Sequence, residues 1–479
     1  MKHSSIPLCG RAARLALALF IALAPAALSA QTTPEPRRDQ LLNGLRVVTL
    51  SRPGDPQTLL RLRVHTGAAF DLAGKEGLTA LLGDALFDAQ TREYVSDELA
   101  GRIEVSTTYD SVDVVLAGRA QDFDRLLELL RNAVINTQLT PEAVTALRDA
   151  RRKALAEKRS AAETADRAAS ARLYNVHPYA RPVAGTPESV ARVERPDLML
   201  LRERFLNPNN STLVVVGGVE HRRVMNALRQ TVGAWRKSDR LVPETFRRPE
   251  ATDARVLVVG EPESAGVEVR LAVRGLARND RDRPAAQVLA HLVRDRWAAA
   301  FPDLREHLSV RHEAHRDGGL FILSAAARTP AEAAKALETG RAVLDTLSTA
   351  QPSAAELDAA RRAYLETLDA AQRTPEGWAA AWLDEHSYKT PSVMPAETAR
   401  VLGALTPAEA QRVAARLFQH TPAAAVAVGD AAALRAELAR LGGVEVFGEA
   451  AAAPAVPPAS QPKPAPTPAQ KPGLQLKRP

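Results

Sequence analysis

Histidine and acidic residues that could bind a metal ion gather near the middle of the second half of the chain. His307, His312 and His315 lie close together, and Glu313 stands between the last two. Imidazole and carboxylate groups are common ligands of divalent metals. If residues 310–315 form a strand, however, His312 and His315 point to opposite faces. A metal shared by this cluster is therefore disfavoured.

Two further histidines stand in recognisable local patterns. Asp384-Glu385-His386 is similar to a fragment of a metal-binding helix, but no second histidine stands at helical spacing from His386. We expect this tripeptide to lie on a solvated surface. His177, in the stretch HPYARP, is expected to pack and to form hydrogen bonds.

Other catalytic and binding patterns are missing from the sequence. Cys9 is the only cysteine, and no G-x-S-x-G, P-loop or dinucleotide-binding fingerprint occurs. A thiol or serine nucleophile with a recognisable motif is therefore not expected. Acidic and basic residues are interspersed, with no basic stripe carrying aromatic side chains, so nucleic-acid binding is not expected either.

The first thirty residues are typical of a secretory signal peptide. Lys2, Arg11 and Arg14 precede an apolar run over residues 15–23, and small residues lead to a cleavage site near Ala30. Because the apolar run is too short for a comfortable membrane span, we expect cleavage and no membrane span afterwards. Removing these three basic residues leaves 60 basic and 56 acidic residues, a net charge of +4.

Export also fits the use of cysteine, because Cys9 lies inside the predicted signal peptide. A cysteine-free exported chain of this length is consistent with a bacterial periplasm. Residues 451–479 are rich in alanine, proline and lysine and contain few large apolar groups. Such a composition predicts a disordered tail.

Between these ends, the sequence is typical of two similar halves in tandem. RVVTL begins at Arg46 and RVLVV at Arg255, while apolar strands end at Gly217 and Gly429. Arg46 to Gly217 is 171 positions and Arg255 to Gly429 is 174. Landmarks that recur in the same order predict a duplicated domain.

We therefore expect an α+β fold of two homologous domains, at residues 31–240 and 250–450, joined by a polar linker over residues 237–254. Each domain should contain a mainly antiparallel sheet with helices packed on it. A long helical pattern runs from Pro141 to about Tyr174. Helix N-caps are predicted at four positions: Thr140, Thr329, Ser353 and Thr406.

Several stretches of the chain together resemble one known family. In order they are LLNGLRVV (41–48), VHTGAAF (64–70), GKEGLTALLGDALF (74–87), HPYARPVAGT (177–186), FLNPNNSTLVVVGGVE (205–220), LAVRGLARNDRDRPAAQVLAHLV (271–293), LREHLSVRH (304–312) and AVAVGD (425–430). Their order and spacing are similar to those of the pitrilysin/insulinase family of zinc metallopeptidases, which includes the mitochondrial processing peptidase. The resemblance covers residues 41–449 and implies that the two domains form half of a clam-like chamber.

Active members of that family carry an H-x-x-E-H motif, in which two histidines bind zinc and the glutamate polarises the attacking water. In this chain Ala80 stands at the first ligand, Gly83 at the general base and Asp84 at the second ligand. The third ligand of the family is a downstream glutamate, for which Glu157 is the best match. We therefore expect no zinc site in this chain, and we expect Glu157 to be an ordinary charged residue on a charged helix more than a remnant of the ligand.

The second domain of family members often supplies an arginine and a tyrosine that bind the substrate carbonyl. Arg305 matches the arginine, and His312 stands where the tyrosine is expected. An imidazole N–H can still donate a hydrogen bond, so the pair could form a substrate clamp, in which Arg305 and His312 stabilise developing negative charge. Arg305 could instead simply pair with a nearby carboxylate.

The resemblance implies a catalytically silent subunit of a periplasmic zinc peptidase. Its partner would be an active peptidase of the same family that holds the zinc, in a heterodimer that encloses peptide substrates. Two alternatives remain open: a non-enzymatic peptide-binding or scaffold protein acting as a monomer or homodimer, and an active metalloendopeptidase with an unrecognised site.

Overall fold

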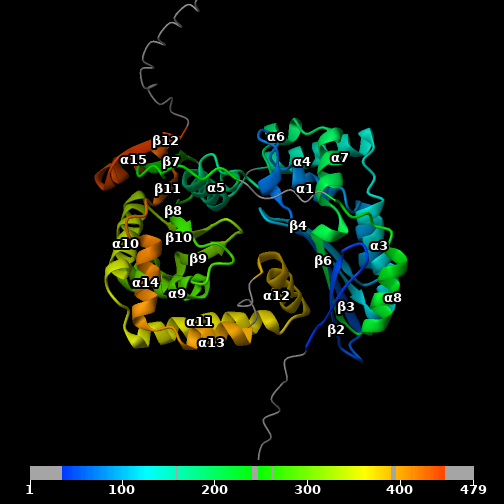
Figure 1. The fold of residues 1–479 in the computed structure, drawn as a ribbon. Helices are drawn as coiled ribbons and strands as arrows, with labels where there is room; N and C mark the ends of the chain where they lie inside the picture. Colours follow the sequence, from blue (N-terminus) through cyan, green and yellow to red (C-terminus); the bar gives the residue numbers. More distant parts are fainter. Residues whose placement is uncertain (1–34, 158, 240–245, 262–263, 390–394, 448–479) are drawn as a thin grey trace, which may run out of the picture.

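The computed structural model contains two six-stranded sheets, one in each half of the chain (Figure 1). The predicted signal peptide and the predicted tail lie outside the residues that the structure describes. Those residues are 35–157, 159–239, 246–261, 264–389 and 395–447.

The first sheet, sheet A, has the strand order β1-β2-β6-β3-β5-β4. Strands β2 and β6 are parallel, and the other neighbours are antiparallel. Most residues of β2, β3, β5 and β6 are buried on both faces of the sheet, because helices cover both sides. The strands of sheet A are β1 (Arg37–Gln40), β2 (Arg46–Ser51), β3 (Gln57–Val64), β4 (Arg102–Thr107), β5 (Val112–Arg119) and β6 (Ser211–Gly217).

The second sheet, sheet B, repeats this plan with the order β12-β7-β11-β8-β10-β9. Strand β7 is parallel to β11 and β12, and the remaining neighbours are antiparallel. The strands of sheet B are β7 (Val256–Gly260), β8 (Val267–Gly275), β9 (Leu308–Ala314), β10 (Gly319–Ala327), β11 (Ala424–Gly429) and β12 (Val444–Phe447). The two sheets thus confirm the predicted α+β fold with mainly antiparallel pairing.

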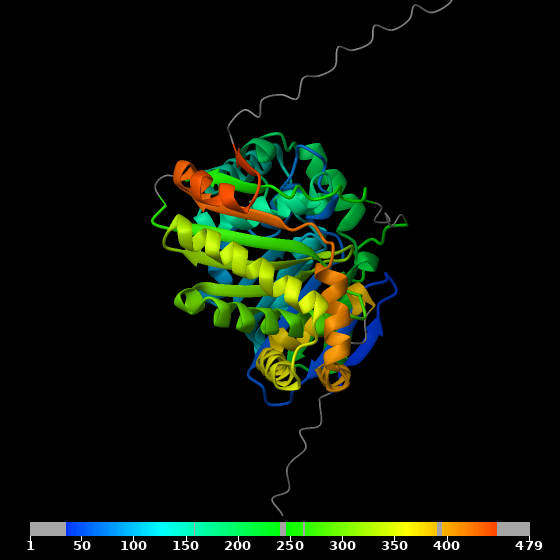
Figure 2. The ribbon, with the colours of Figure 1, turned by 90° about the vertical axis from the view of Figure 1, so that its left-hand side faces the viewer.

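Helices pack against both sheets. Those of the first half are α1 (Leu78–Asp84), α2 (Ala89–Asp97), α3 (Phe123–Ile135), α4 (Pro141–Ala156), α5 (Ala161–Tyr174), α6 (Pro187–Ala191), α7 (Arg195–Phe205) and α8 (His221–Thr231). Those of the second half are α9 (Arg283–Ala300), α10 (Pro330–Thr349), α11 (Ala354–Gln372), α12 (Pro375–Tyr388), α13 (Pro395–Gly403), α14 (Pro407–Phe418) and α15 (Ala431–Leu438). Helices α3 and α8 cover sheet A (Figure 1), whereas α9, α10, α14 and α15 share a core with sheet B (Figure 2).

The two halves exchange one helix each. Helix α5 belongs to the first half but packs on sheet B, and α12 belongs to the second half but packs on sheet A (Figure 1). Ala165, Ala169 and Leu173 of α5 share a core with strands of sheet B. Trp382 and Leu383 of α12 share one with strands of sheet A. Burial of these apolar faces ties the halves together, an arrangement that the sequence did not predict.

The predicted helix from Pro141 to Tyr174 is wrong in one respect, because it is two helices. Helix α4 ends at Ala156, and α5 begins after Ser160. The Ser160 hydroxyl accepts from the Glu163 backbone N–H, and the Glu163 carboxylate accepts from the Ser160 N–H. This capping box satisfies backbone donors at a helix start and so favours the break.

The four predicted N-caps are confirmed, since Thr140, Thr329, Ser353 and Thr406 each accept a backbone N–H at a helix start. Within the described residues, none of the helices has the length and apolar character needed to cross a membrane.

Candidate functional site

Helix α1 carries the positions that correspond to the zinc motif, and the loop before it is held tightly. Gly77 has a φ of 90°, and a Cβ there would lie 2.6 Å from the carbonyl oxygen of Ala184, so only glycine fits. The buried Asp71 carboxylate accepts from the backbone N–H groups of Gly77 and Thr79, at 2.8 and 2.9 Å. Burial raises the pKa of Asp71 to about 6, although these hydrogen bonds oppose the shift. The motif helix therefore keeps a fixed place.

The side chains at the motif positions cannot form the zinc site. Ala80 is buried and offers no ligand atom. A Cβ at Gly83 would lie 3.2 Å from Val105 Cγ1 and 3.4 Å from Thr107 Oγ1, so β4 leaves little room there. Beside Gly83 lies an apolar cavity of about 20 Å³, roughly the space of one water molecule.

The only carboxylate at the motif positions, that of Asp84, is already paired with an arginine side chain. The Asp84 carboxylate forms an ion pair with the guanidinium of Arg151 on α4. Arg151 Nε also donates to the Ala184 carbonyl oxygen at 3.2 Å, so its side chain bridges α1, α4 and the Ala184 loop. The Asp84 carboxylate is therefore not free to bind a metal ion.

Glu157, the best match to the third ligand position of the family, lies in the break between α4 and α5, outside the charged helix expected for it, and is exposed. Among the residues that the structure describes, no three histidine, cysteine, aspartate or glutamate side chains are grouped closely enough to hold a metal ion. Zinc bound by protein needs three or four such ligands. The residues present at the motif positions therefore do not fit the zinc that the family implies.

Arg305 and His312 lie in different surroundings. Arg305 is exposed on the short 3₁₀-helix Pro302–His307, which precedes β9. The His312 side chain is buried and faces the helix layer outside sheet B, where its Nε2 accepts from the Leu276 backbone N–H at 2.9 Å. His312 is therefore turned into the domain core, and this position is against the expectation that it donates a hydrogen bond to a substrate.

The other predicted histidines are separated as well. His307 is exposed, whereas the His315 ring packs edge-on against Tyr109 and at a tilt against Tyr179, both of the first half. His177 packs edge to face on Tyr179, and its Nδ1 accepts from the Tyr179 backbone N–H at 3.2 Å. The structural role expected of His177 agrees with this arrangement.

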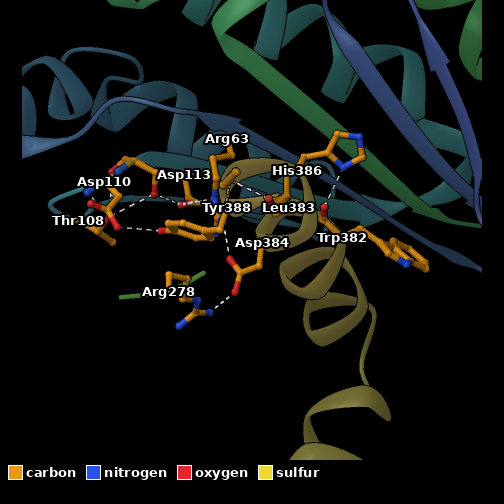
Figure 3. Close-up of polar contacts among 12 residues, drawn as sticks. Arg63, Thr108, Asp110, Asp113, Arg278, Trp382, Leu383, Asp384, His386 and Tyr388 are labelled. Carbon is orange, nitrogen blue, oxygen red and sulfur yellow. Dashed lines mark hydrogen bonds and ion pairs between the residues drawn. The ribbon is translucent and has the colours of Figure 1, made fainter. Parts of the chain in front are cut away.

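The expectation that Asp384-Glu385-His386 is solvated surface is wrong for Asp384. Asp384 is only 8% exposed, and its carboxylate accepts from Arg63 Nη1 of β3 at 2.6 Å. The other oxygen binds Arg278 of the second half (Figure 3). Since helix α12 packs on sheet A, Asp384 lies between the halves and not on the surface.

Neighbouring groups extend this buried network. Arg63 Nε also donates to Asp113 at 2.9 Å. The Tyr388 hydroxyl donates to Asp110 at 3.0 Å (Figure 3). The two guanidinium groups lower the pKa of Asp384, although burial opposes them. No sequence signal predicted the network, because Arg63 and Asp384 are 321 residues apart.

Two sequence models of one peptidase family match adjoining parts of the chain. "Insulinase (Peptidase family M16)" matches residues 46–187, and "Peptidase M16 inactive domain" matches residues 192–364. The chain belongs to peptidase family M16. The predicted resemblance to the pitrilysin/insulinase family is thereby confirmed.

Relatives of this M16 chain include proteins described as zinc proteases. One from Mycobacterium leprae, described as an uncharacterized zinc protease, is 25% identical over 261 residues, 53% of this chain and 58% of the relative. Cytochrome b-c1 complex subunit 1 of Bos taurus is 23% identical over 203 residues, 41% of this chain and 42% of that one. The matched region thus spans roughly half the length of these relatives.

Solved structures share the fold of this M16 chain more completely. A protease from Helicobacter pylori superposes with a TM-score of 0.73 at 18% identity, over 82% of this chain and 99% of that one. The periplasmic protease PqqL from Escherichia coli gives a TM-score of 0.71 at 18% identity, over 84% of this chain but only 48% of that one. The fold of this chain therefore corresponds to about half of the longer protease.

Proposed function

We propose that this M16 chain is a catalytically silent subunit of a zinc peptidase complex, which helps to enclose and bind peptides for an active partner. One observation carries the proposal: Arg151 forms an ion pair with Asp84 on a motif helix that also has Ala80 and Gly83. Helix α1 still spans the motif positions, but its side chains lack the set of free nitrogen and oxygen atoms that would bind zinc. Without ligands for zinc, the water-activating step of the family has no place here.

The proposed partner is an M16 chain with an intact H-x-x-E-H motif. Supporting this, the present fold corresponds to 48% of the length of the E. coli protease. A second chain of similar size would supply the remaining half. The active partner would hold the zinc, and this chain would supply the opposing wall of the peptide chamber.

Arg305 is the residue proposed to reach the substrate. Its side chain is exposed, so it is accessible to a peptide carbonyl or to a partner. His312 has no part in this proposal, because its ring is buried on the helix side of sheet B. The clamp is thus reduced to a single guanidinium, which can donate two hydrogen bonds to one acceptor group.

The proposed location is the periplasm. The charged, apolar and small-residue regions of residues 1–30 support it, and one neighbour in fold is a periplasmic protease. The experiment is to purify the tagged mature chain from its own periplasm and to identify its companion by intact mass. A stoichiometric chain with H-x-x-E-H is the expected result. Recovery of the chain alone, or only as a homodimer, would instead favour a non-enzymatic binding protein.

A further inference from the structure

An open pocket of about 530 Å³ lies between α7 and the segment that joins α3 to α4. Residues 136–141 form one wall, and Arg195, Met199 and Arg202 of α7 form the other. All of these residues belong to the first half of the chain, and α3 and α7 lie away from sheet B (Figure 1). The volume is within the range typical of ligand pockets in proteins.

The two arginines of the pocket are held in place by backbone carbonyl groups at the end of α3. Arg202 donates from Nη2 to the Ile135 carbonyl oxygen at 2.6 Å and from Nη1 to that of Thr137 at 3.2 Å. Arg195 donates from Nε to the Leu139 carbonyl oxygen at 2.5 Å. Because both guanidinium groups are ordered before a ligand arrives, less side-chain entropy is lost on binding.

Most N–H groups of these arginines remain available to a ligand. A guanidinium has five N–H donors. Within the described residues, carbonyl groups engage two donors of Arg202 and one of Arg195. Arg195 is exposed and Arg202 is half-buried, so water reaches both side chains. The two Nη groups of Arg195 are the pair of donors that can bind one carboxylate through two parallel hydrogen bonds.

Carboxylates near the pocket do not neutralise these arginines. None of the residues that line the pocket is acidic. Asp197, on the same helix, pairs with Lys75 at 2.6 Å. Three further acidic residues close in sequence are exposed and line no part of the pocket: Glu142, Glu194 and Glu203. Within the described part of the chain, neither arginine of the pocket forms an ion pair with a carboxylate.

The helix wall of the pocket combines charge with an apolar group. Arg195, Met199 and Arg202 stand at i, i+4 and i+7 and so share one face of α7. Met199 is 44% exposed and lies between the two arginines along the helix. Methionine is unbranched and adapts to irregular apolar partners. The wall thus presents two positive groups, about 10 Å apart along the helix axis, with an apolar group between them.

We propose that this pocket binds an extended acidic segment of a partner protein, in which two carboxylates flank an apolar side chain. In an extended peptide, alternate side chains point to the same face, and residues i and i+4 are about 13 Å apart. Long glutamate side chains at these two positions match Arg195 and Arg202, and an apolar residue at i+2 matches Met199. The tail of the chain itself is unsuited, because residues 451–479 contain four basic residues and no acidic one.

The test is isothermal titration calorimetry of the full mature chain with the peptide acetyl-Glu-Ser-Leu-Ser-Glu-amide. The same peptide with glutamine in place of both glutamates is the control for charge. We expect saturable binding of one acidic peptide per chain and no binding of the glutamine peptide. Binding should weaken as sodium chloride is raised from about 0.05 M to about 0.3 M, because salt screens exposed charges.

Matched variants locate the binding in the pocket. Met199→Glu places a carboxylate between the two arginines and should weaken binding by about tenfold or more. Leu200→Glu is its control, since Leu200 is 48% exposed on the same helix but does not line the pocket. Arg195→Gln should weaken binding by about tenfold. The same change at Arg204, which is exposed on α7 outside the pocket, should change binding by less than about twofold.

Thermal melting of each variant establishes that it is folded before binding is compared. The proposal is overturned if about 1 mM acidic peptide gives no saturable binding, or if the glutamine peptide binds equally well. Equal weakening by Met199→Glu and Leu200→Glu would contradict it, because binding would then lie elsewhere. Complete displacement of the peptide by an equal concentration of inorganic phosphate would also contradict it, since a general anion site would then explain the binding.

Discussion

Asp384→Asn tests whether the buried ion pairs join the two halves of the chain. The substitution keeps the shape of the side chain and removes its charge. Arg63 and Arg278 then lose the carboxylate that they share, while both stay in place beneath α12. The side chains of Arg63 and Asp384 are only 8% and 12% exposed and that of Arg278 is 28% exposed, so water compensates little of the lost charge.

The expected cost is about 3–5 kcal/mol, which is typical of removing one partner from a buried pair. Most of this cost arises from buried guanidinium charge that is left with less compensation, since Arg63 keeps only Asp113, and only part arises from the attraction itself. Since α12 belongs to the second half and packs on sheet A, the loss should weaken the contact between the halves more than either half alone.

The assay is urea unfolding, followed by circular dichroism and by tryptophan fluorescence, to which Trp378 and Trp382 on α12 contribute two of the four indoles of the chain. The neighbouring Glu385→Gln is the matched control, because Glu385 pairs with Arg38 and their side chains are 29% and 46% exposed. An exposed pair contributes about 0–1 kcal/mol. If Asp384→Asn costs less than about 1 kcal/mol, or no more than the control, the reasoning fails.

Acid gives a second signature of the same carboxylate. Because both arginines hold the pKa of Asp384 below its ordinary value of 3.8, its contribution is complete above that pH. It is lost as the pH falls through the lower pKa of the folded state. The difference in stability between the wild type and Asp384→Asn should therefore shrink only below about pH 4.

Three other predictions concern separate parts of the chain. Arg305→Ala should lower the turnover of the partner in the reconstituted complex without changing assembly, measured by peptide cleavage and gel filtration; unchanged turnover would remove Arg305 from the proposal. Ser160→Ala should destabilise α5 by about 1 kcal/mol, because the capping box is lost, and hydrogen exchange of α5 amides would show it; unaltered protection would contradict this. Burial, and then neighbouring arginines, lower the pKa of His65 to about 3 from 6.5. As the pH falls, His65 is therefore protonated in the unfolded chain before it is protonated in the folded chain. The free energy of unfolding should fall below pH 6.5 by up to about 1.4 kcal/mol per pH unit. His65→Gln should make that slope shallower in pH-dependent melting, and an equal slope would contradict the assignment.

Much of the fold could be predicted because its signals are local or repeated. The spacing of RVVTL and RVLVV predicted a duplication, and Thr-Pro and Ser-x-x-Glu patterns predicted where helices start. The exchange of α5 and α12 could not be predicted, because an apolar helix face shows that it is buried but not against which sheet. The break at Ser160 was missed since residues on both sides favour helix.

In the candidate site, too, some features follow from the sequence and others depend on how distant segments pack. Loss of ligands at Ala80 and Gly83 follows from residue identity alone. The pairing of Arg151 with Asp84 depends on how α4 lies against α1, and the burial of Asp384 depends on an arginine in the other half. The orientation of His312 follows from the register of β9, which the sequence leaves undetermined. Long-range packing decides each of these points.

The most direct test of the central claim is a zinc and cleavage measurement on the purified mature chain, alone and with its H-x-x-E-H companion. We predict no stoichiometric zinc and no cleavage of a peptide library by the chain alone. Together, the two chains should bind one zinc per pair and cleave peptides faster than the companion does alone, and a chelator should abolish this activity. One zinc per chain and chelator-sensitive cleavage by the chain alone would contradict the account.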